Sequence, residues 1–317
     1  MKILITGCAG FIGYHLANSL NSKNIMIYGI DNMNDYYSLK LKKLRLSILS
    51  KKKNFRFVRL DISNYKKLEN IFSKTKIDIV VNLAAQAGVR YSLINPRDYV
   101  QSNMSGFFNI LDLSKKYGIK KILYASSSSV YGDKRKYPVN ENEIANPKNI
   151  YSLSKKNNEE IASIYYKQFG LSSIGLRFFT VYGEWGRPDM LMMKYMLAKL
   201  NNKKFILNNK GKHYRDFTYI DDVVFVLKKL ILKKTKGHEI YNVCSNKPIK
   251  VSKILSKLDF LYGQPKIIHK GKLSIEVLKT HGSNLKIKKF IKIKKFTSLN
   301  QGILNLVSWA KQYLKKI

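Results

Sequence analysis

A tyrosine and a lysine four residues apart, Tyr151 and Lys155, could together perform acid–base chemistry. If this segment is helical, the spacing places both side chains on one face, one turn apart. A phenol titrates near pH ~10, which is too high for a base at neutral pH. An ammonium group one turn away favours the phenolate and is expected to lower the phenol pKa. Such a pair also arises by chance in a chain with 21 tyrosines, so the surrounding sequence has to decide.

A glycine-rich turn near the start of the chain predicts a dinucleotide site. Gly7, Gly10 and Gly13 follow the β-branched run 2–6 and open an expected helix at 11–21. In this context the first glycine permits a tight turn, the second lets a pyrophosphate approach the backbone, and the third allows close helix–strand packing. The helix N-terminus then offers free N–H groups to the phosphates.

An acidic residue at the end of the next expected strand indicates which dinucleotide binds. Asp31 lies about 18 residues after Gly13 and is followed by Asn32. A carboxylate at this place accepts hydrogen bonds from ribose hydroxyls and repels a 2′-phosphate. Because no arginine stands within the next several residues, NAD is favoured over NADP.

The elements that must position these residues alternate between strand and helix. Strands are expected at 2–6, 25–30, 55–60, 77–83, 119–126 and 173–178, and helices at 11–21, 39–49, 65–72, 100–117 and 150–169. This alternation predicts an α/β protein of Rossmann type with a doubly wound parallel sheet. We expect an NAD-binding domain at 1–180, with contributions from about 215–245, and a smaller α/β cap at 181–317 that binds the substrate.

Composition excludes several other classes of protein. The net charge of +39 is spread along the chain without an arginine-rich block, so we interpret it as solvated surface that attracts anionic ligands rather than as a nucleic-acid site. No stretch approaches ~18 apolar residues, and the N-terminus lacks the features of a signal peptide, so no membrane association is expected. Two cysteines fit a reducing cytoplasm, and the five histidines show no metal-ligand spacing.

Several motifs resemble those of the extended short-chain dehydrogenase/reductases, the nucleotide-sugar epimerases and dehydratases. They are Gly7–Gly13, Asp31-Asn32, Asp61-Ile62, Leu83-Ala84-Ala85, Tyr151 with Lys155, and Leu176–Phe179. Further segments resemble the UDP-glucuronate 4-epimerases most closely: 31–37, 84–92, 125–132, 176–182, 185–190 and 215–222. The likeness fades after about 250, where relatives carry Pro-Gly-Asp and Ala-Asp but this chain has Ser274-Ile275-Glu276 and Gly282-Ser283.

The resemblance implies a mechanism and a set of site residues. Tyr151 takes the proton of the sugar 4-hydroxyl while hydride leaves C4 for tightly bound NAD, the 4-keto intermediate rotates, and hydride returns to the other face. Lys155 lowers the tyrosine pKa and bonds the nicotinamide ribose, and Ser127 holds the 4-oxygen and shuttles a proton. The implied cofactor-binding residues are Gly7, Gly10, Phe11, Ile12, Gly13, Asp31, Asn32, Asp61, Ile62, Leu83, Ala84, Ala85, Asn103, Tyr151, Lys155 and Phe178.

The segment 127–129 separates epimerisation from elimination. Dehydratases and decarboxylases of this group carry an acid there, whereas this chain has Ser128 and Ser129. Oxidation of a glucuronate at C4 gives a β-keto acid, so an epimerase must hold the carboxylate in an orientation that prevents loss of CO₂. We expect Ser128, Ser129, Thr180 and Arg187 to do so. The implied substrate-binding residues are Gln86, Arg90, Ser127, Ser128, Ser129, Thr180, Arg187 and Arg215.

Two other readings stay open at this point. The chain could epimerise UDP-GlcNAc/GalNAc or their uronic acids, or, in a different class, it could be a non-catalytic NAD-binding regulator. Such regulators commonly lose the tyrosine or the lysine, and both are present here. The resemblance also implies a homodimer formed through the helices expected at 100–117 and 150–169.

Overall fold

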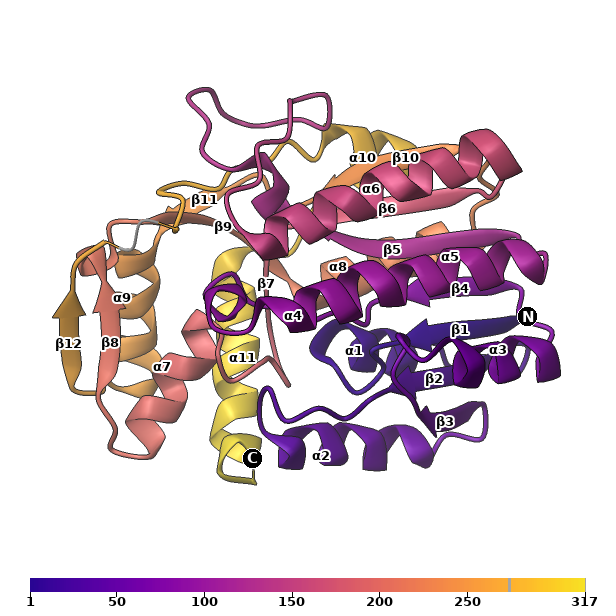
Figure 1. Ribbon diagram of the computed structural model, residues 1–317. Coiled ribbons are helices and arrows are strands. Elements are labelled where there is room, and N and C mark those ends of the chain that lie inside the picture. The colour runs from indigo at the N-terminus through magenta and orange to yellow at the C-terminus, as the bar shows by residue number, and fades with distance from the viewer. Residues whose placement is uncertain (273–274, 317) are drawn as a thin grey trace.

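A seven-stranded parallel sheet forms the centre of the molecule. The computed structural model describes residues 1–272 and 275–316. The strand order is β10-β6-β5-β4-β1-β2-β3, and all six neighbouring pairs are parallel (Figure 1). The strands are β1 (Lys2–Thr6), β2 (Met26–Asp31), β3 (Phe55–Arg59), β4 (Ile79–Asn82), β5 (Lys121–Ser127), β6 (Ser173–Phe178) and β10 (His238–Val243). The predicted doubly wound α/β fold is confirmed.

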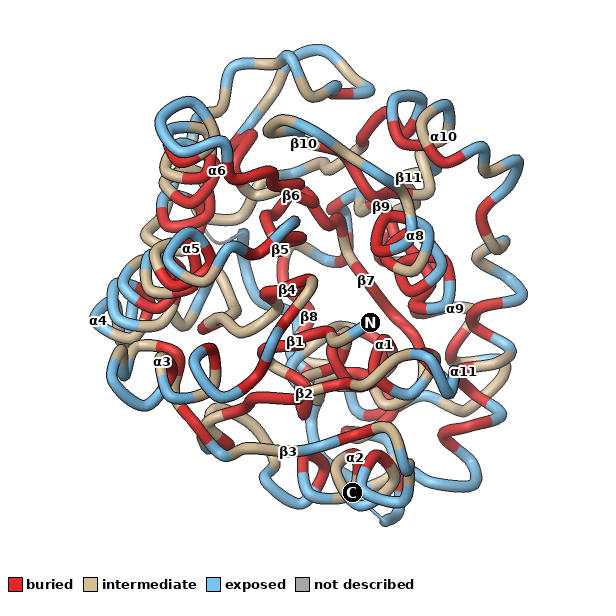
Figure 2. Tube along the Cα trace, turned by 90° about the vertical axis from the view of Figure 1, so that its right-hand side faces the viewer, coloured by how far each residue is buried: buried red, intermediate tan, exposed pale blue. Residues whose placement is uncertain are grey.

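Helices cover both faces of this sheet, so its central strands are buried (Figure 2). On one face α1 packs against α2 and α8, and on the other α5 packs against α3 and α6. Their bounds are α1 (Phe11–Ser19), α2 (Leu39–Ser50), α3 (Tyr65–Lys74), α5 (Gly106–Lys116), α6 (Ile150–Phe169) and α8 (Ile220–Leu232). Helix α6 has sharp ends, because Asn149 and Ser152 form a capping box at its start and Gly170 adopts φ +70° after its end.

The helix expected at 100–117 is not uniform. The short helix α4 (Pro96–Asp98) leads into a π-helical turn at Tyr99–Ser105, and only then does α5 begin. A π-helical turn inserts one extra residue per turn and is frequent at functional sites. It contains Asn103, one of the predicted site residues.

The second half of the chain builds a smaller α/β part beside the sheet. A three-stranded sheet joins β7 (Thr180–Tyr182), β9 (Tyr214–Tyr219) and β11 (Pro248–Lys250), and a two-stranded one joins β8 (Phe205–Asn208) and β12 (Ile267–Lys270). The helices are α7 (Leu191–Leu200), α9 (Val251–Tyr262), α10 (Leu285–Ile291) and α11 (Leu299–Tyr313). After β9 the chain returns through α8 to the large sheet, where β10 forms the edge beside β6 (Figure 1).

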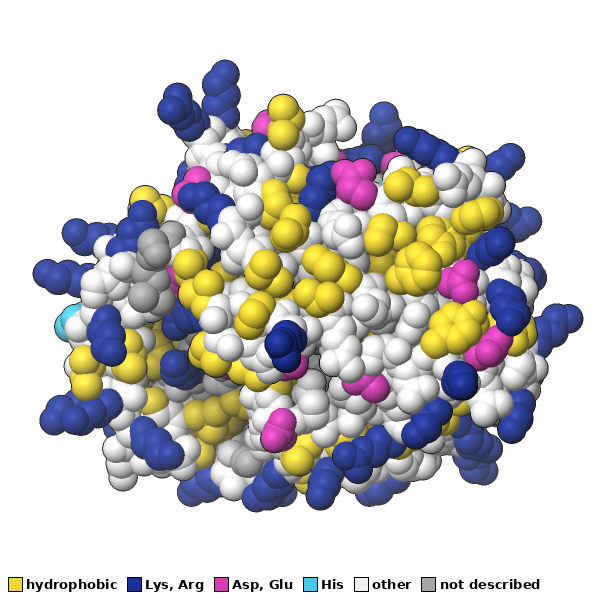
Figure 3. All heavy atoms as spheres, viewed as in Figure 1, with side chains coloured by type: hydrophobic (Ala, Val, Ile, Leu, Met, Phe, Trp, Pro, Cys, Tyr) yellow, Lys and Arg dark blue, Asp and Glu magenta, His cyan; other side chains and the backbone are white. Residues whose placement is uncertain are grey.

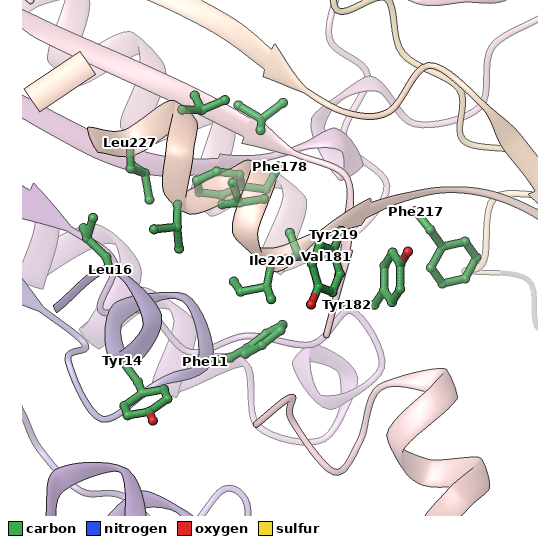
Figure 4. Close-up of a cluster of buried hydrophobic side chains, with 14 of the residues drawn as sticks. Phe11, Tyr14, Leu16, Phe178, Val181, Tyr182, Phe217, Tyr219, Ile220 and Leu227 are labelled. Carbon is green, nitrogen blue, oxygen red and sulfur yellow. The ribbon is translucent and has the colours of Figure 1, made fainter. Parts of the chain in front are cut away.

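One hydrophobic core joins the two parts. Phe11 and Leu16 of α1 pack in the same cluster as Val181 of β7 and as Ile220 and Leu227 of α8 (Figure 4). Burial of each such side chain contributes about 1.5–3 kcal/mol to folding. The parts therefore share stabilising contacts that fix the surface between them.

Among the described residues, the structure contains no helix with the length and apolar character needed to cross a membrane.

Candidate active site

A cavity of about 780 Å³ opens at the carboxyl ends of the parallel strands and extends to the smaller part. This edge of a doubly wound sheet is where such folds bind ligands. The predicted site residues line this cavity, with the exception of Asn103. Lysine and arginine outnumber aspartate and glutamate on its wall, which suits anionic ligands.

The glycine-rich turn forms the floor at one end. Gly7 adopts φ +70°, and a Cβ atom placed there would lie 2.7 Å from the backbone nitrogen of Ala84. A Cβ at Gly13 would lie 2.1 Å from the carbonyl oxygen of Gly7. The turn therefore leaves no room for side chains at these two positions. Helix α1 begins directly after the turn, and the backbone N–H groups of its first turn have no partners within the helix. This cradle fits the pyrophosphate of NAD.

Two carboxylates, those of Asp31 and Asp61, line the same cavity as the glycine-rich turn. Asp31 accepts hydrogen bonds from the backbone N–H groups of Ala9 (3.1 Å) and Met33 (2.8 Å), which fix its orientation at the end of β2. Burial raises the pKa of Asp61, but hydrogen bonds from Asn32 and Ser63 outweigh that effect and lower it overall. Asp31 stands where a ribose hydroxyl would donate, so the residues present fit NAD.

The candidate base and its lysine lie on the first turns of α6. The Lys155 ammonium donates a hydrogen bond to the carbonyl oxygen of Ala125 on β5 (2.8 Å). Burial lowers the pKa of Lys155 to about 8, although the charge of Glu159 opposes this. Burial also raises the pKa of Tyr151, while a side-chain interaction with Ser127 and the charge of Arg187 lower it. The expected net lowering of the tyrosine pKa is therefore wrong for this structure, because desolvation of the phenol outweighs the nearby charges.

The serine run delivers hydroxyl groups to the same place. Ser127 ends β5, and its hydroxyl oxygen accepts hydrogen bonds from the Ser129 hydroxyl (2.9 Å) and the Ser129 N–H (3.2 Å). Its own proton remains available for donation. Ser126 instead donates to Glu159 (2.5 Å), which forms a buried ion pair with Arg177.

Arg187 faces the cavity from the loop before α7, but its guanidinium already has a partner. Its Nε donates to Oδ1 of Asp189 (3.0 Å) and its Nη2 to Oδ2 (2.5 Å). The Tyr36 hydroxyl donates to the same carboxylate (3.1 Å), and the Tyr36 ring lies 5.8 Å from the guanidinium. Arg187 is thus held in one orientation, and within the described part of the chain its Nη1 donates no hydrogen bond.

The far end of the cavity gathers the remaining predicted cations. Nε of Arg90 donates to Glu276 (2.8 Å), and Nε2 of His213 lies 3.8 Å from the same carboxylate. Arg215 lines the cavity beside them. The predicted anion contact Arg90 is therefore paired with an acid, and an anionic ligand would have to compete with Glu276 for it. Ser274, which the sequence placed in this segment, lies outside the described residues.

Asn103 stands behind the cavity wall. Its Oδ1 accepts from the N–H of Gln86 (2.7 Å), and its Nδ2 donates to the Gln86 carbonyl (3.0 Å) and to Ser154 (3.0 Å). Asn103 thus connects the loop after β4 to α6 and supports the site without lining it. The contact of Asn103 with the cofactor stays a prediction.

Sequence reasoning missed other residues of the cavity. Tyr36 and Asp189 stand within recognised motifs but received no role, because their link to Arg187 exists only after folding. Phe205 and Leu207 of β8 also line the wall, and no motif marks them. Glu276 could have been suspected, because it is an acid in the segment 274–276, where the family resemblance implies one.

Comparisons with known proteins decide the family. A model of the NAD dependent epimerase/dehydratase family matches residues 3–244. The chain belongs to this family. The predicted membership and the predicted dependence on NAD are thereby confirmed.

Relatives within the NAD dependent epimerase/dehydratase family span the whole chain. Protein CapI of Staphylococcus aureus is 38% identical and covers 100% of both chains. A UDP-glucuronate 4-epimerase of Thermodesulfobacterium geofontis is 36% identical, over 99% of this chain and 97% of its own. The crystal structure of UDP-glucuronic acid 4-epimerase from Bacillus cereus, in complex with UDP-glucuronic acid and NAD, has a TM-score of 0.93 at 30% identity and covers 98% of this chain and 99% of that one.

Proposed function

We propose that this chain is an NAD-dependent UDP-glucuronate 4-epimerase, an isomerase that interconverts UDP-glucuronate and UDP-galacturonate. The observation that carries the proposal is the polar centre of the cavity. There Tyr151 and Ser127 lie beside hydroxyls and a fixed guanidinium, and the segment 127–129 contains no carboxylate. The relatives named UDP-glucuronate 4-epimerase support it over the full length of the chain.

The proton transfer is assigned to Tyr151 and Ser127. Bound NAD would supply a hydride acceptor and donor for C4 of the sugar. Tyr151, as the phenolate, takes the 4-hydroxyl proton and later returns it, and the Ser127 hydroxyl, which donates a hydrogen bond to the same oxygens, relays that proton between them. Lys155 has a pKa of about 8, so most of it is protonated at pH 7, and its charge favours the phenolate form of Tyr151 that accepts the proton, against the burial that raises the pKa of this tyrosine.

The sugar carboxylate is assigned to Ser128, Ser129, Thr180 and Arg187. A 4-keto uronic acid loses CO₂ when the bond to its carboxylate lies parallel to the carbonyl π system. Asp189 and Tyr36 fix the guanidinium of Arg187, so it cannot move with the sugar carboxylate. Rotation of that carboxylate into the orientation that loses CO₂ would break its hydrogen bonds to Arg187.

The affinity for the nucleotide is assigned to the far end. The sugar must rotate so that hydride can return to its other face, which requires loose binding of the ring. Remote groups then have to supply the binding energy. Arg215 and Arg90 line the cavity there and would contact the diphosphate, with Gln86 nearer the ring. In this proposal residues 1–180, together with about 215–245, hold NAD, and 181–317 hold the UDP-sugar.

One incubation tests the reaction and the retained cofactor together. The purified chain is mixed with UDP-glucuronate without added NAD, and the product is identified by NMR. UDP-galacturonate is the expected product, and NAD is released on denaturation. Turnover of UDP-GlcNAc without turnover of UDP-glucuronate would show that the substrate is an N-acetylhexosamine nucleotide. Turnover of neither would favour the alternative of a non-catalytic NAD-binding regulator.

The carboxylate assignment has its own test. Arg187→Ala and Thr180→Val are expected to release CO₂ and a pentose nucleotide during turnover. Arg56→Ala, at an exposed site on β3, serves as the control. If the two cavity variants released no more CO₂ than this control, the protective role of Arg187 and Thr180 would be wrong.

We also propose a homodimer that pairs α5 and α6 with their copies. Phe108, Leu153, Ile164 and Phe169 of these helices are exposed, and hydrophobic side chains gather over them (Figure 3). A patch of this kind is typical of an interface. Ile164→Glu is expected to give monomers in sedimentation velocity, whereas Phe260→Glu on α9, 90% exposed, leaves the assembly unchanged.

A cytoplasmic location is part of the same proposal. Cys8 and Cys244 are both free and buried, which suits a reducing compartment.

A further inference from the structure

Helix α2 carries a fully buried arginine on the face that otherwise holds core residues. Arg45 has 0% of its surface exposed, and its helical neighbours Leu41 and Leu49 are equally buried. Arginine is almost never fully buried unless it is paired. The motifs that identify the family do not include it, and the cavity lining does not include it either.

The guanidinium of Arg45 connects two segments that are distant in sequence. Its Nη1 donates to the carbonyl oxygen of Ala9 in the glycine-rich turn (2.8 Å) and to the Tyr37 hydroxyl (2.8 Å). Its Nη2 donates to the carbonyl oxygens of Trp185 and Gly186, the latter at 3.4 Å. Arg45 therefore joins the turn that cradles pyrophosphate to the backbone directly before Arg187.

Arg45 holds the backbone of both segments. The N–H of Ala9 is bonded to Asp31, so the Arg45 bond to its carbonyl fixes the other side of the same residue. Trp185 adopts φ +54°, a left-handed conformation that is strained for a bulky side chain. Such strain persists only where the surroundings hold it. Here Arg45 holds the carbonyl, and the rings of Trp309 and Tyr313 pack on the indole at centroid distances of 5.3 Å and 5.8 Å.

A purely structural role explains this residue poorly. Within the described part of the chain, Arg45 forms no ion pair with a carboxylate, and its Nε has no hydrogen-bond partner. Burial of a cation that only carbonyl and hydroxyl dipoles compensate is costly, and an apolar residue would pack at this position without that cost. Sites that hold strain and buried charge together are commonly functional.

We propose that Arg45 is a positioning residue that couples the dinucleotide turn to the loop that presents Arg187. The guanidinium fixes the Ala9 carbonyl on one side and the Trp185 and Gly186 carbonyls on the other. Displacement of either segment moves the other through one rigid, planar group. This inference rests on the proposed function, in which the turn holds NAD and Arg187 holds the sugar carboxylate.

Three variants of the full chain test the coupling. Arg45→Met removes the donors and keeps most of the volume, and Arg45→Lys keeps the charge on a single point that cannot reach both segments. Lys121→Met is the matched control, because Lys121 is also buried and, among residues 1–272 and 275–316, donates only to the backbone carbonyls of Leu230, Ile231 and Lys233. The measurements are NAD released per chain, KM and kcat for UDP-glucuronate, and the share of turnover that ends as CO₂.

Arg45→Met is expected to lose NAD, to raise KM about tenfold or more, and to increase the CO₂ share, since a shift of about 1 Å in a positioning group has effects of this size. Arg45→Lys should fall between this variant and wild type, and Lys121→Met should match wild type in all three measurements. If Arg45→Met does not fold, Arg45→Lys alone carries the test. Wild-type values of NAD content and CO₂ share in the folded Arg45 variant would overturn the proposal.

A double variant separates coupling from independent damage. If Arg45 acts through Arg187, the CO₂ share of Arg45→Met with Arg187→Ala should equal that of Arg187→Ala alone, because neighbouring groups in one network are not additive. If the CO₂ share of the double variant instead reflects the product of the two single effects, the link between Arg45 and Arg187 would be wrong. Failure of the proposed function is distinguishable, because wild type itself would then form no UDP-galacturonate while NAD content still reports on Arg45 and the turn.

Discussion

Three glycine-to-alanine variants can separate backbone strain from close contact at the dinucleotide turn. Gly170, after α6, has φ +70°, and no atom of the described residues lies within 4 Å of an added Cβ, so Gly170→Ala introduces strain alone. Gly13 has helical backbone, but its Cβ would lie 2.1 Å from the Gly7 carbonyl oxygen, so Gly13→Ala introduces contact alone. Gly7→Ala introduces both, with φ +70° and a Cβ 2.7 Å from the Ala84 nitrogen.

The expected magnitudes follow from these geometries. Left-handed backbone costs a residue with a Cβ roughly 1–2 kcal/mol, so Gly170→Ala should lower the free energy of unfolding by about 1 kcal/mol. At Gly13 the contact must open by about 1 Å, and overpacking of this kind costs about 1–3 kcal/mol. That movement displaces the N–H groups that face pyrophosphate, and loss of one charge-assisted hydrogen bond is worth about 1.5–3 kcal/mol. The affinity of Gly13→Ala for NAD should therefore fall at least about tenfold.

Urea denaturation and titration with NAD, followed by calorimetry, measure the two effects separately. Gly170→Ala should bind NAD as wild type does while losing stability, and Gly7→Ala should show the larger defect in both measurements. Wild-type NAD affinity in Gly13→Ala would refute the reasoning, because the turn would then tolerate a Cβ where the structure leaves no room. Loss of NAD in Gly170→Ala would also refute it, since that site lies outside the cavity lining.

Three further predictions concern buried charges and the base. Glu159→Gln should destabilise the chain by about 3–5 kcal/mol in urea denaturation, because it leaves Arg177 buried without its partner, whereas Glu160→Gln on the surface should cost under about 1 kcal/mol. Burial raises the pKa of Asp216 to about 6, so the folded state binds the Asp216 proton more tightly than the unfolded state does. The free energy of unfolding should therefore fall as the pH rises from about 4 to 6. In Asp216→Asn this contribution, up to about 3 kcal/mol, should disappear from the difference in the free energy of unfolding between pH 4 and pH 6.5. Tyr151→Phe should lose nearly all turnover of UDP-glucuronate and keep its NAD, and substantial turnover would remove Tyr151 from the mechanism.

The sequence predicts best what depends on neighbouring residues. The bounds of α6 and β6 match the expected ranges at both ends, and those of α6 follow from the local capping signals of Asn149, Ser152 and Gly170. The glycine-rich turn could be predicted equally well, because a Cβ at any of its three glycines would clash with nearby backbone atoms. The π-helical turn at 99–105 was missed, because its extra residue leaves no periodic signal that differs from that of a helix.

Features that depend on contacts distant in sequence could not be predicted. Arg45 contacts Trp185 across 140 positions, and Arg90 meets Glu276 across 186. Motif reading placed Arg187 among the site residues, and Arg187 lines the cavity, but its orientation depends on the Asp189 carboxylate, which the fold of the loop places beside it. The pKa of Tyr151 also required the structure, because burial, which the spacing to Lys155 does not reveal, determines its direction.

The position of β10 in the sheet has a consequence for synthesis of the chain. Its partner β6 ends at Phe178, yet β10 begins at His238, after the strands β7, β8 and β9 of the smaller part have been made. During translation β6 therefore remains an open, apolar edge while about sixty more residues are added at ~5–20 residues per second. For several seconds the nascent chain presents a surface that can pair with other strands. A fragment cut after residue 180 would retain that edge permanently, which makes truncation there a route to aggregation rather than to an isolated NAD-binding unit.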